Sequence, residues 1–326
     1  MLDVETGEVL AMVNQPTYNP NDRSQLAAER YRNRAITDIF EPGSSLKPLV
    51  VAAALESGQY RPSSIIDTAP GYIVVGPKKI EDSRNLGRVS LTTILARSSN
   101  VGITKLAMTL QPDQLWETMT HFGLGELTTS GFPGESAGML THYSNWRPIS
   151  QATLAYGYGV SVTPLQLAQA YAALGSRGQM RPVSLLALDA PGEGHQVLSE
   201  ETATSVRRML EEVVRPGGTG TKAAIDGYRV AGKTGTAWKF ATGGYSQDKY
   251  ISIFAGLAPA SDPRLATVVV IDEPGGELYY GSDVAAPVFA DVMSESLRLL
   301  AIAPDALPAR DPGSVVQAVA ARPETR

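Results

Sequence analysis

The sequence predicts an α+β fold, in which an antiparallel sheet is built from both termini and a helical insertion separates its strands. Strand patterns occupy residues 1–13 near one end of the chain and 228–231, 250–257 and 265–271 near the other. The apolar residues between them recur mostly at helical spacing. With 326 residues, 43% of them hydrophobic, the chain is long enough for one large domain or two small ones.

The N-terminal segment is expected to form a hairpin, because apolar residues alternate on either side of the turn at Glu5-Thr6-Gly7. So abrupt a start predicts that part of the protein lies upstream of Met1. A polar connector with two prolines, residues 14–33, then leads to the first helix.

The first helix is expected to begin after Pro42 and Gly43, two residues that fit poorly inside a helix, and to end at Gly58. Its body, residues 49–55, is apolar on every side. A helix of this kind is normally buried, so only its N-terminal end can reach a cleft.

Ser44 and Lys47 lie at that N-terminal end, three residues apart and therefore on one face of the helix. The free N–H groups and the positive end of the helix dipole favour negative charge beside a serine there. A desolvated lysine can remove the hydroxyl proton, which makes the pair a candidate nucleophile and base for acyl transfer. Alone, a Ser-x-x-Lys pair is more often an ordinary surface feature than a catalytic one.

The rest of the chain alternates between loops and helices. The prolines, glycines and short β-branched runs of residues 59–90 predict loops with small strands. Helices are expected over 90–97, 101–110, 112–122, 163–175, 199–215 and 284–300. We expect the folded domain to span residues 1–303, because the composition of 304–326 is typical of a disordered tail.

Two further polar motifs interrupt apolar surroundings. Ser98-Ser99-Asn100 breaks a helical pattern, and Lys233-Thr234-Gly235-Thr236 lies at the end of the strand that starts at Tyr228. Alternation places Lys233 and Gly235 on one side of that strand, and the glycine allows a backbone or a ligand to approach closely. Each motif also has a plainer interpretation, the first as a helix break with a capping serine and the second as an edge strand with a protective lysine.

Composition excludes several classes of function. The net charge of −5 and the absence of a basic run argue against nucleic acid as a partner. No stretch approaches the roughly 18 apolar residues that a membrane-spanning helix needs. The sequence contains no cysteine, which removes disulfides, thiolate catalysis and cysteine-bound metals together.

In the order Ser-x-x-Lys, Ser-x-Asn, Lys-Thr-Gly, the three motifs resemble those of penicillin-binding proteins and class A β-lactamases. Over nearly its whole length the chain is similar to the transpeptidase domain of the class B, division-specific branch, penicillin-binding protein 3. The resemblance extends to residues 14–21, 32–44 and 154–159, and to Asn100, where the elongation-specific branch typically carries aspartate.

The resemblance implies a penicillin-binding transpeptidase or serine β-lactamase-like fold with helices on both faces of the sheet, and chemistry without a cofactor or metal. It implies that Ser44 attacks the carbonyl between the two terminal D-alanines of a peptidoglycan stem peptide, and that Lys47 takes its proton. Ser98 and Asn100 are implied to relay protons and hold the peptide. We expect burial and the charge of Lys233 to lower the pKa of Lys47.

The strand motif is implied to bind the other end of the substrate. The backbone N–H groups of Ser44 and Thr236 would form the oxyanion hole, and Lys233 would supply positive charge. The hydroxyls of Thr234 and Thr236 would bind the terminal carboxylate, with Gly235 beside them.

The resemblance further implies an inner-membrane anchor and a non-catalytic pedestal domain that this chain lacks, with the catalytic domain in the periplasm. The implied partners are peptidoglycan stem peptides, β-lactam antibiotics that acylate the nucleophile, and membrane proteins of cell division, among them one that polymerises glycan.

Trp238 departs from the pattern of this branch, in which arginine or another non-aromatic residue is usual. Trp238, Tyr158 and Phe254 are expected to wall the cleft together and to alter its shape and its drug preference. The alternative is that Trp238 packs on the sheet away from the ligand.

Two rival functions remain open at this point. A serine β-lactamase shares the motifs but hydrolyses its acyl-enzyme, for which a class A enzyme uses a glutamate and a bound water. Glu135 lacks the flanking pattern of that glutamate and is expected to be a loop carboxylate. A non-catalytic sensor would bind ligand without turnover, and the presence of all three motifs argues against it.

Overall fold

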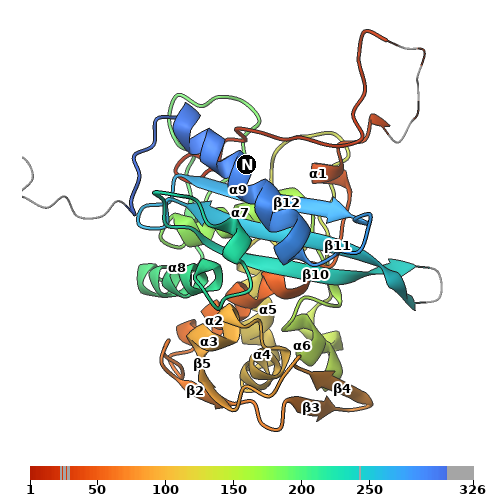
Figure 1. Cartoon of the computed structure of the whole chain (residues 1–326), viewed down its shortest axis with the longest axis vertical. Helices are drawn as coiled ribbons and strands as arrows, with labels where there is room; N and C mark the ends of the chain where they lie inside the picture. Colours follow the sequence, from red (N-terminus) through yellow and green to blue (C-terminus); the bar gives the residue numbers. More distant parts are fainter. Residues whose placement is uncertain (23, 25–26, 28–29, 242–243, 307–326) are drawn as a thin grey trace, which may run out of the picture.

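A four-stranded antiparallel sheet forms the centre of the molecule (Figure 1). The computed structural model describes residues 1–306 apart from 23, 25–26, 28–29 and 242–243. The strand order is β1-β12-β11-β10, so the first strand of the chain pairs with the last, and the predicted assembly from both termini is confirmed. The strands are β1 (Leu2–Asp3), β10 (Ala231–Ala241), β11 (Gly244–Ala258) and β12 (Leu265–Asp272).

Helices cover both faces of this sheet, as predicted. The side chains of β11 alternate between two apolar layers because successive residues of a strand point to opposite faces. Ile253 lies in the layer that contains α7 (Pro164–Gly175) and α8 (Glu200–Val214). Phe254 lies in the opposite layer, beneath α9 (Gly281–Leu299).

The helical insertion lies beyond the edge strand β10 (Figure 1). Its central helix is α2 (Lys47–Glu56), preceded by the 3-10 turn η3 (Gly43–Leu46). Residues 47–54 are all buried, as the all-apolar sequence of this helix predicts. The other helices are α1 (Arg34–Thr37), α3 (Leu91–Ala96), α4 (Asn100–Ala107), α5 (Pro112–His121) and α6 (Pro148–Leu154). Of the helices described, none combines the length and apolarity needed to cross a bilayer.

Capping side chains define where the principal helices begin. Thr163 and Gln166 form a capping box at the start of α7, and Ser99 accepts a hydrogen bond from the backbone N–H of Gly102 at the start of α4. The predicted helix start at Thr163 and the predicted helix break at residues 97–100 are therefore confirmed.

Four two-stranded sheets and two further 3-10 turns complete the described part of the chain. The strands pair as β2 (Ile65–Asp67) with β5 (Arg88–Ser90), β3 (Tyr72–Val75) with β4 (Lys78–Glu81), β6 (Met139–Leu140) with β7 (Val160–Ser161), and β8 (Gln179–Met180) with β9 (His195–Gln196). The turns are η4 (Tyr143–Asn145) and η5 (Thr221–Ala223). The first two sheets confirm the small strands predicted between residues 59 and 90.

The predicted N-terminal hairpin is confirmed, and one other strand prediction is corrected. In the hairpin the N–H of Asp3 donates to the carbonyl of Glu8 at 2.9 Å, and Leu2 bridges Val9 on one edge while it pairs with β12 on the other. Strand β10 begins at Ala231, since Tyr228 closes a turn with Ile225, and it continues to residue 241. The Lys-Thr-Gly motif therefore lies near the start of its strand and not at its end.

Hydrogen bonds hold the end of the described chain against the loops beside the central sheet. The Asp305 carboxylate accepts hydrogen bonds from the backbone N–H groups of Arg229 (2.7 Å) and Ser261 (3.0 Å). The N–H of Ala306 donates to the carbonyl of Gly227 at 3.0 Å. The fold thus extends to Ala306, beyond the predicted boundary at residue 303, and the rest of the predicted tail lies outside the described residues.

Candidate active site

The three predicted motifs meet at one cavity of about 570 Å³. Ser44 reaches it from η3, Ser98 and Asn100 from the junction of α3 and α4, and residues 234–236 from β10. The cavity is completed by Asp82, Ser83, Arg84, Leu86, Arg97, Thr219, Tyr280 and Ser282. Residues far apart in the sequence are thus brought together as an acyl-transfer site requires.

Lys47 begins α2, its backbone N–H donates to the carbonyl of Ser44, and its side chain is fully buried. Its Nζ lies 2.6 Å from the carbonyl oxygen of Ser98, 3.2 Å from Ser98 Oγ and 2.8 Å from Asn100 Oδ1. Burial lowers the pKa of Lys47 well below its ordinary value, and the charge of Lys233 lowers this pKa further, as predicted. A lysine whose pKa is lowered in this way gives up its proton more readily, which suits it to act as a base.

Lys233 is the second buried lysine of the site. Its Nζ donates to Ser98 Oγ at 3.0 Å and to the carbonyl of Thr234 at 3.1 Å. Burial lowers the pKa of Lys233 to about 7. Because Lys47 contacts the same hydroxyl, Ser98 connects the two lysines and is suitably placed to pass a proton.

Asp82 holds the Ser-x-Asn loop in position. One carboxylate oxygen accepts the backbone N–H groups of Asn100 (2.5 Å) and Val101 (3.0 Å), and the other accepts the hydroxyl of Ser99 (2.5 Å). These bonds cap α4 and stabilise the left-handed backbone of Ser98, whose φ is 56°. The sequence analysis missed Asp82, because it lies 18 residues before Asn100 and no local pattern connects it with the helix that it caps.

The nucleophile turn depends on close approaches between backbones. The N–H of Gly43 donates to the carbonyl of Gly157 at 3.1 Å, and a Cβ on Gly157 would lie 2.0 Å from the carbonyl oxygen of Gly43. A Cβ on Gly235 would lie 2.9 Å from the carbonyl oxygen of Pro42. The predicted close approach at Gly235 is therefore confirmed, and its neighbour is the turn that carries Ser44.

The threonines of the strand motif are oriented by two neighbours. Thr234 Oγ1 lies 3.0 Å from the hydroxyl of Thr219, and Thr236 Oγ1 accepts a hydrogen bond from the N–H of Gly281 at 2.9 Å. Thr219, which the sequence analysis also missed, lines the cavity beside them. This side of the cavity therefore offers a row of hydroxyl donors, which suits a carboxylate.

The predicted aromatic wall is only partly assembled. Trp238 is half-exposed, and its backbone N–H donates to the hydroxyl of Tyr158 at 3.2 Å. Neither residue lines the cavity beside Ser44, so their effect on ligands stays a prediction. The prediction for Phe254 is wrong, because its ring is fully buried under α9, with its centroid 4.6 Å from that of Phe289.

Glu135 is a loop carboxylate, as expected. It accepts hydrogen bonds from the backbone N–H of Thr128 at 2.7 Å and from the hydroxyl of Ser130 at 2.8 Å. It does not line the cavity. Among the described residues, no group of three or more His, Asp or Glu side chains could hold a metal ion.

Comparison with known proteins agrees with this geometry. The penicillin binding protein transpeptidase domain matches residues 1–294. The chain is 48% identical to the peptidoglycan D,D-transpeptidase FtsI of Escherichia coli K12 over 97% of its own length and 53% of that protein. It is 43% identical to the probable peptidoglycan D,D-transpeptidase PenA of Neisseria meningitidis, over 93% of its own length and 52% of that protein. The chain thus spans about half the length of these curated relatives.

A solved structure shows the same fold. The apo transpeptidase domain of penicillin-binding protein 3 from Burkholderia pseudomallei has a TM-score of 0.86 and 42% identity, over 94% of this chain and 88% of that one. The fold and the family indicated by the three motifs are confirmed, and the chain belongs to the penicillin-binding protein transpeptidase family.

Proposed function

We propose that this chain is the catalytic part of a peptidoglycan D,D-transpeptidase, which cross-links stem peptides through an acyl-enzyme on Ser44. The observation that carries the proposal is the hydroxyl of Ser98 between two buried lysines, at the cavity that Ser44 lines. This arrangement supplies a nucleophile, a base with a lowered pKa and a proton path, which are the groups that acyl transfer needs.

Acylation begins when Ser44 Oγ attacks the carbonyl between the two D-alanines and its proton passes to Lys47. The oxyanion is stabilised by the backbone N–H groups of Ser44 and Thr236, a type of contact that contributes about 3 kcal/mol per donor. The peptide C–N bond then breaks, and the proton reaches the departing D-alanine amine through Ser98. Ser44 is left as an ester of the donor peptide.

The second half-reaction returns Ser44 to its free state. An amine of a neighbouring peptide attacks the ester carbonyl and its proton passes to Lys47. The new amide forms as the C–O bond to Ser44 breaks and Lys47 returns the proton to the serine oxygen. Water is a weaker nucleophile than the amine, and its attack would need a further base in the cavity besides Lys47. The one carboxylate lining the cavity, Asp82, already accepts three hydrogen bonds from Ser99, Asn100 and Val101. This favours transpeptidation over β-lactam hydrolysis, because general-base help is worth about 10²–10⁴-fold.

Intact-protein mass spectrometry after mixing with a penicillin tests the proposal. One adduct should appear on Ser44, be absent from Ser44→Ala, and persist for minutes to hours. Loss of the adduct within seconds, with catalytic accumulation of penicilloic acid, would show a β-lactamase. A stable adduct without cross-linking of a stem-peptide donor to an amine acceptor would show a non-catalytic sensor.

We further propose that the complete protein is anchored in the inner membrane and places this domain in the periplasm, where it takes part in septal wall synthesis with division proteins and a glycan polymerase. The similarity to the peptidoglycan D,D-transpeptidase FtsI of Escherichia coli supports this proposal. Co-purification of the full-length protein with membrane proteins of the division site, and its position in dividing cells, test it.

A further inference from the structure

The cavity beside Ser44 has a positively charged part that the mechanism above does not use. Arg84 and Arg97 both line it, and both side chains are exposed. Within the described residues, neither guanidinium has an ion pair or a hydrogen bond. The one carboxylate in the cavity, Asp82, is already occupied by the Ser-x-Asn loop. Two charges without partners in a binding cavity point to an anionic group on the ligand.

Lys233, the expected source of that charge, is fully buried behind the cavity-lining residue Ser98. It does not line the cavity, and its Nζ is occupied by Ser98 Oγ and the carbonyl of Thr234. With the pKa lowered to about 7 by burial, its charge is only partly present at neutral pH. The position and bonding of Lys233 therefore make it a partner of Ser98.

Arg97 lies next to the hydroxyls that would bind a carboxylate. The residue before it, Ala96, accepts a hydrogen bond through its carbonyl from the N–H of Thr219 at 3.1 Å. Thr219 in turn contacts the hydroxyl of Thr234 at 3.0 Å. A Cβ on Gly217 would lie 3.1 Å from Arg97 Nη2, so the guanidinium is beside the same loop.

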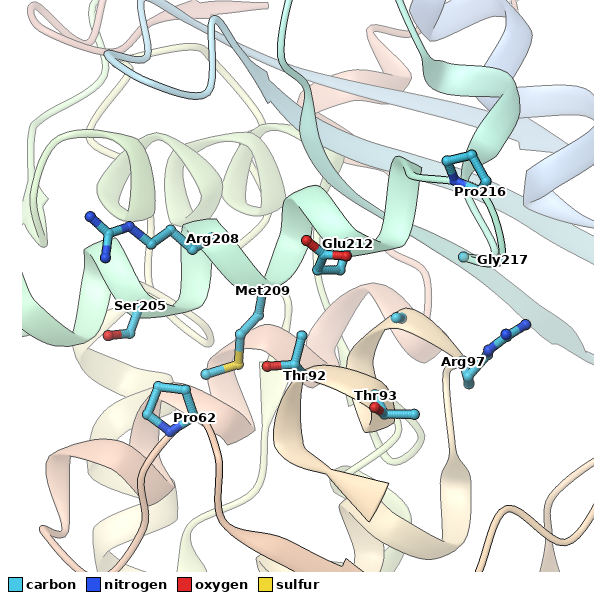
Figure 2. A pocket seen from close by; sticks show the side chains of 12 residues that line it. Pro62, Thr92, Thr93, Arg97, Ser205, Arg208, Met209, Glu212, Pro216 and Gly217 are labelled. Carbon is cyan, nitrogen blue, oxygen red and sulfur yellow. The ribbon is translucent and has the colours of Figure 1, made fainter. Parts of the chain in front are cut away.

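Arg97 also borders a second cavity, of about 560 Å³, between α3 and α8 (Figure 2). Figure 2 shows its side chain at the end of that cavity near Gly217, directed away from Thr92 and Thr93. Glu212, the one carboxylate lining this second cavity, pairs with Arg215. Neither cavity therefore offers Arg97 a carboxylate that is free of other partners.

We propose that Arg97 is the residue that recognises the negative charge of the substrate's terminal carboxylate, with Arg84 adding to the positive field around it. The inference rests on the proposed function. The hydroxyls of Thr219, Thr234 and Thr236 orient the carboxylate, and the guanidinium supplies a charge that persists across the working pH range. Its planar fork also matches the two carboxylate oxygens. Arg97 would thereby distinguish a free carboxylate from an amide or an ester.

Benzylpenicillin and its methyl ester are suitable probes, because they differ only at this group, which is an anion in the acid and a neutral ester in the other compound. The second-order rate constant for acylation of Ser44 is measured with each compound by intact-protein mass spectrometry. In Arg97→Gln the ratio of the two constants, acid over ester, should fall about tenfold or more. Arg97→Lys and Arg84→Gln should give smaller losses. Arg88→Gln, an exposed arginine outside the cavity, should leave the ratio unchanged.

The ratio separates recognition from a structural effect. Equal losses with the acid and the ester in Arg97→Gln would mean that Arg97 only shapes the loop at residues 217–219, and would overturn the inference. An unchanged ratio would overturn it as well. If the wild-type chain is acylated by neither compound, the proposed function itself fails. Arg97→Lys keeps the charge and gives a second, milder test should the glutamine variant fold poorly.

Discussion

Lys47 can act as a base because it is excluded from solvent and its neighbour Lys233 carries a like charge. Arginine keeps its charge and cannot accept the proton of Ser44. We therefore expect Lys47→Arg to slow penicillin acylation on the order of 10²-fold or more. Fluorescent penicillin labelling measures the rate, with circular dichroism to check the fold. Lys105→Arg, outside the site, is the matched control, and a near-normal rate in Lys47→Arg would contradict the assignment.

Asp82 acts on the pKa of Lys47 in the opposite direction to burial and Lys233. Its negative charge raises the pKa of Lys47 and so partly offsets the lowering by burial and by Lys233. Acylation should rise with pH as Lys47 loses its proton, since only the neutral amine is a base. In Asp82→Asn we expect the rising limb of the pH–rate profile to move to lower pH and the plateau to fall as the loop at Ser98 loosens. A rising limb that moves to higher pH would contradict this prediction. Asp113→Asn, a substitution on the surface, is the control and should leave the profile unchanged.

At the scale of elements, the nucleophile turn is positioned by the segment that follows α6. Gly157 and Gly159 both have positive φ, 85° and 79°, so alanine is conformationally strained at either position. Only at Gly157 does a Cβ collide with backbone, 2.0 Å from the carbonyl oxygen of Gly43. Gly157→Ala should therefore lower the unfolding free energy by about 1–3 kcal/mol more than Gly159→Ala and should also slow acylation. Chemical denaturation and penicillin labelling measure the two effects, and equal behaviour of the variants would refute the argument.

The β10–β11 hairpin carries Trp238 at a half-exposed position. If its indole borders bound ligands, Trp238→Ala should change the relative acylation rates of β-lactams that differ in side chain, without loss of folding. Phe240→Ala, a more exposed aromatic residue on the same strand, is the comparison variant. If Trp238→Ala changed the acylation rates of all β-lactams in the panel by the same factor, Trp238 would have only a structural role.

Local signals predicted the helices well, because caps and prolines act within a few residues. The capping box at Thr163 and the glycine after α2 are examples. Long-range contacts could not be predicted in the same way. Asp82 binds a loop that is distant from it in the sequence. Phe254 is buried because α9 packs on that face of the sheet, and α9 follows it by many residues. The family resemblance supplied the catalytic roles, whereas Asp82, Thr219 and Arg97 required coordinates.

At the scale of the whole molecule, both apolar layers depend on the last part of the chain. β12 pairs with β1 and β11, and α9 covers the face that contains Phe254. A chain that ends at residue 260 lacks both elements and exposes both layers. We expect it to show no cooperative thermal unfolding and to be digested rapidly in limited proteolysis, whereas the full chain shows one transition. A protease-resistant shortened chain would contradict this expectation.

The pairing of β1 with β12 also determines when the sheet can form during synthesis of the protein. Leu2 emerges from the ribosome long before its partner Ala266, because nearly all of the domain lies between them in the sequence. Such distant pairing folds slowly, because the entropy of closing a long loop comes before any gain from the contact. Until then the nascent chain carries Ser44 without Lys233, and the edge of β1 that later pairs with β12 is open to aggregation. The proposed acyl-transfer site is complete only when translation has delivered the final strands, so an interrupted chain should not be acylated at Ser44.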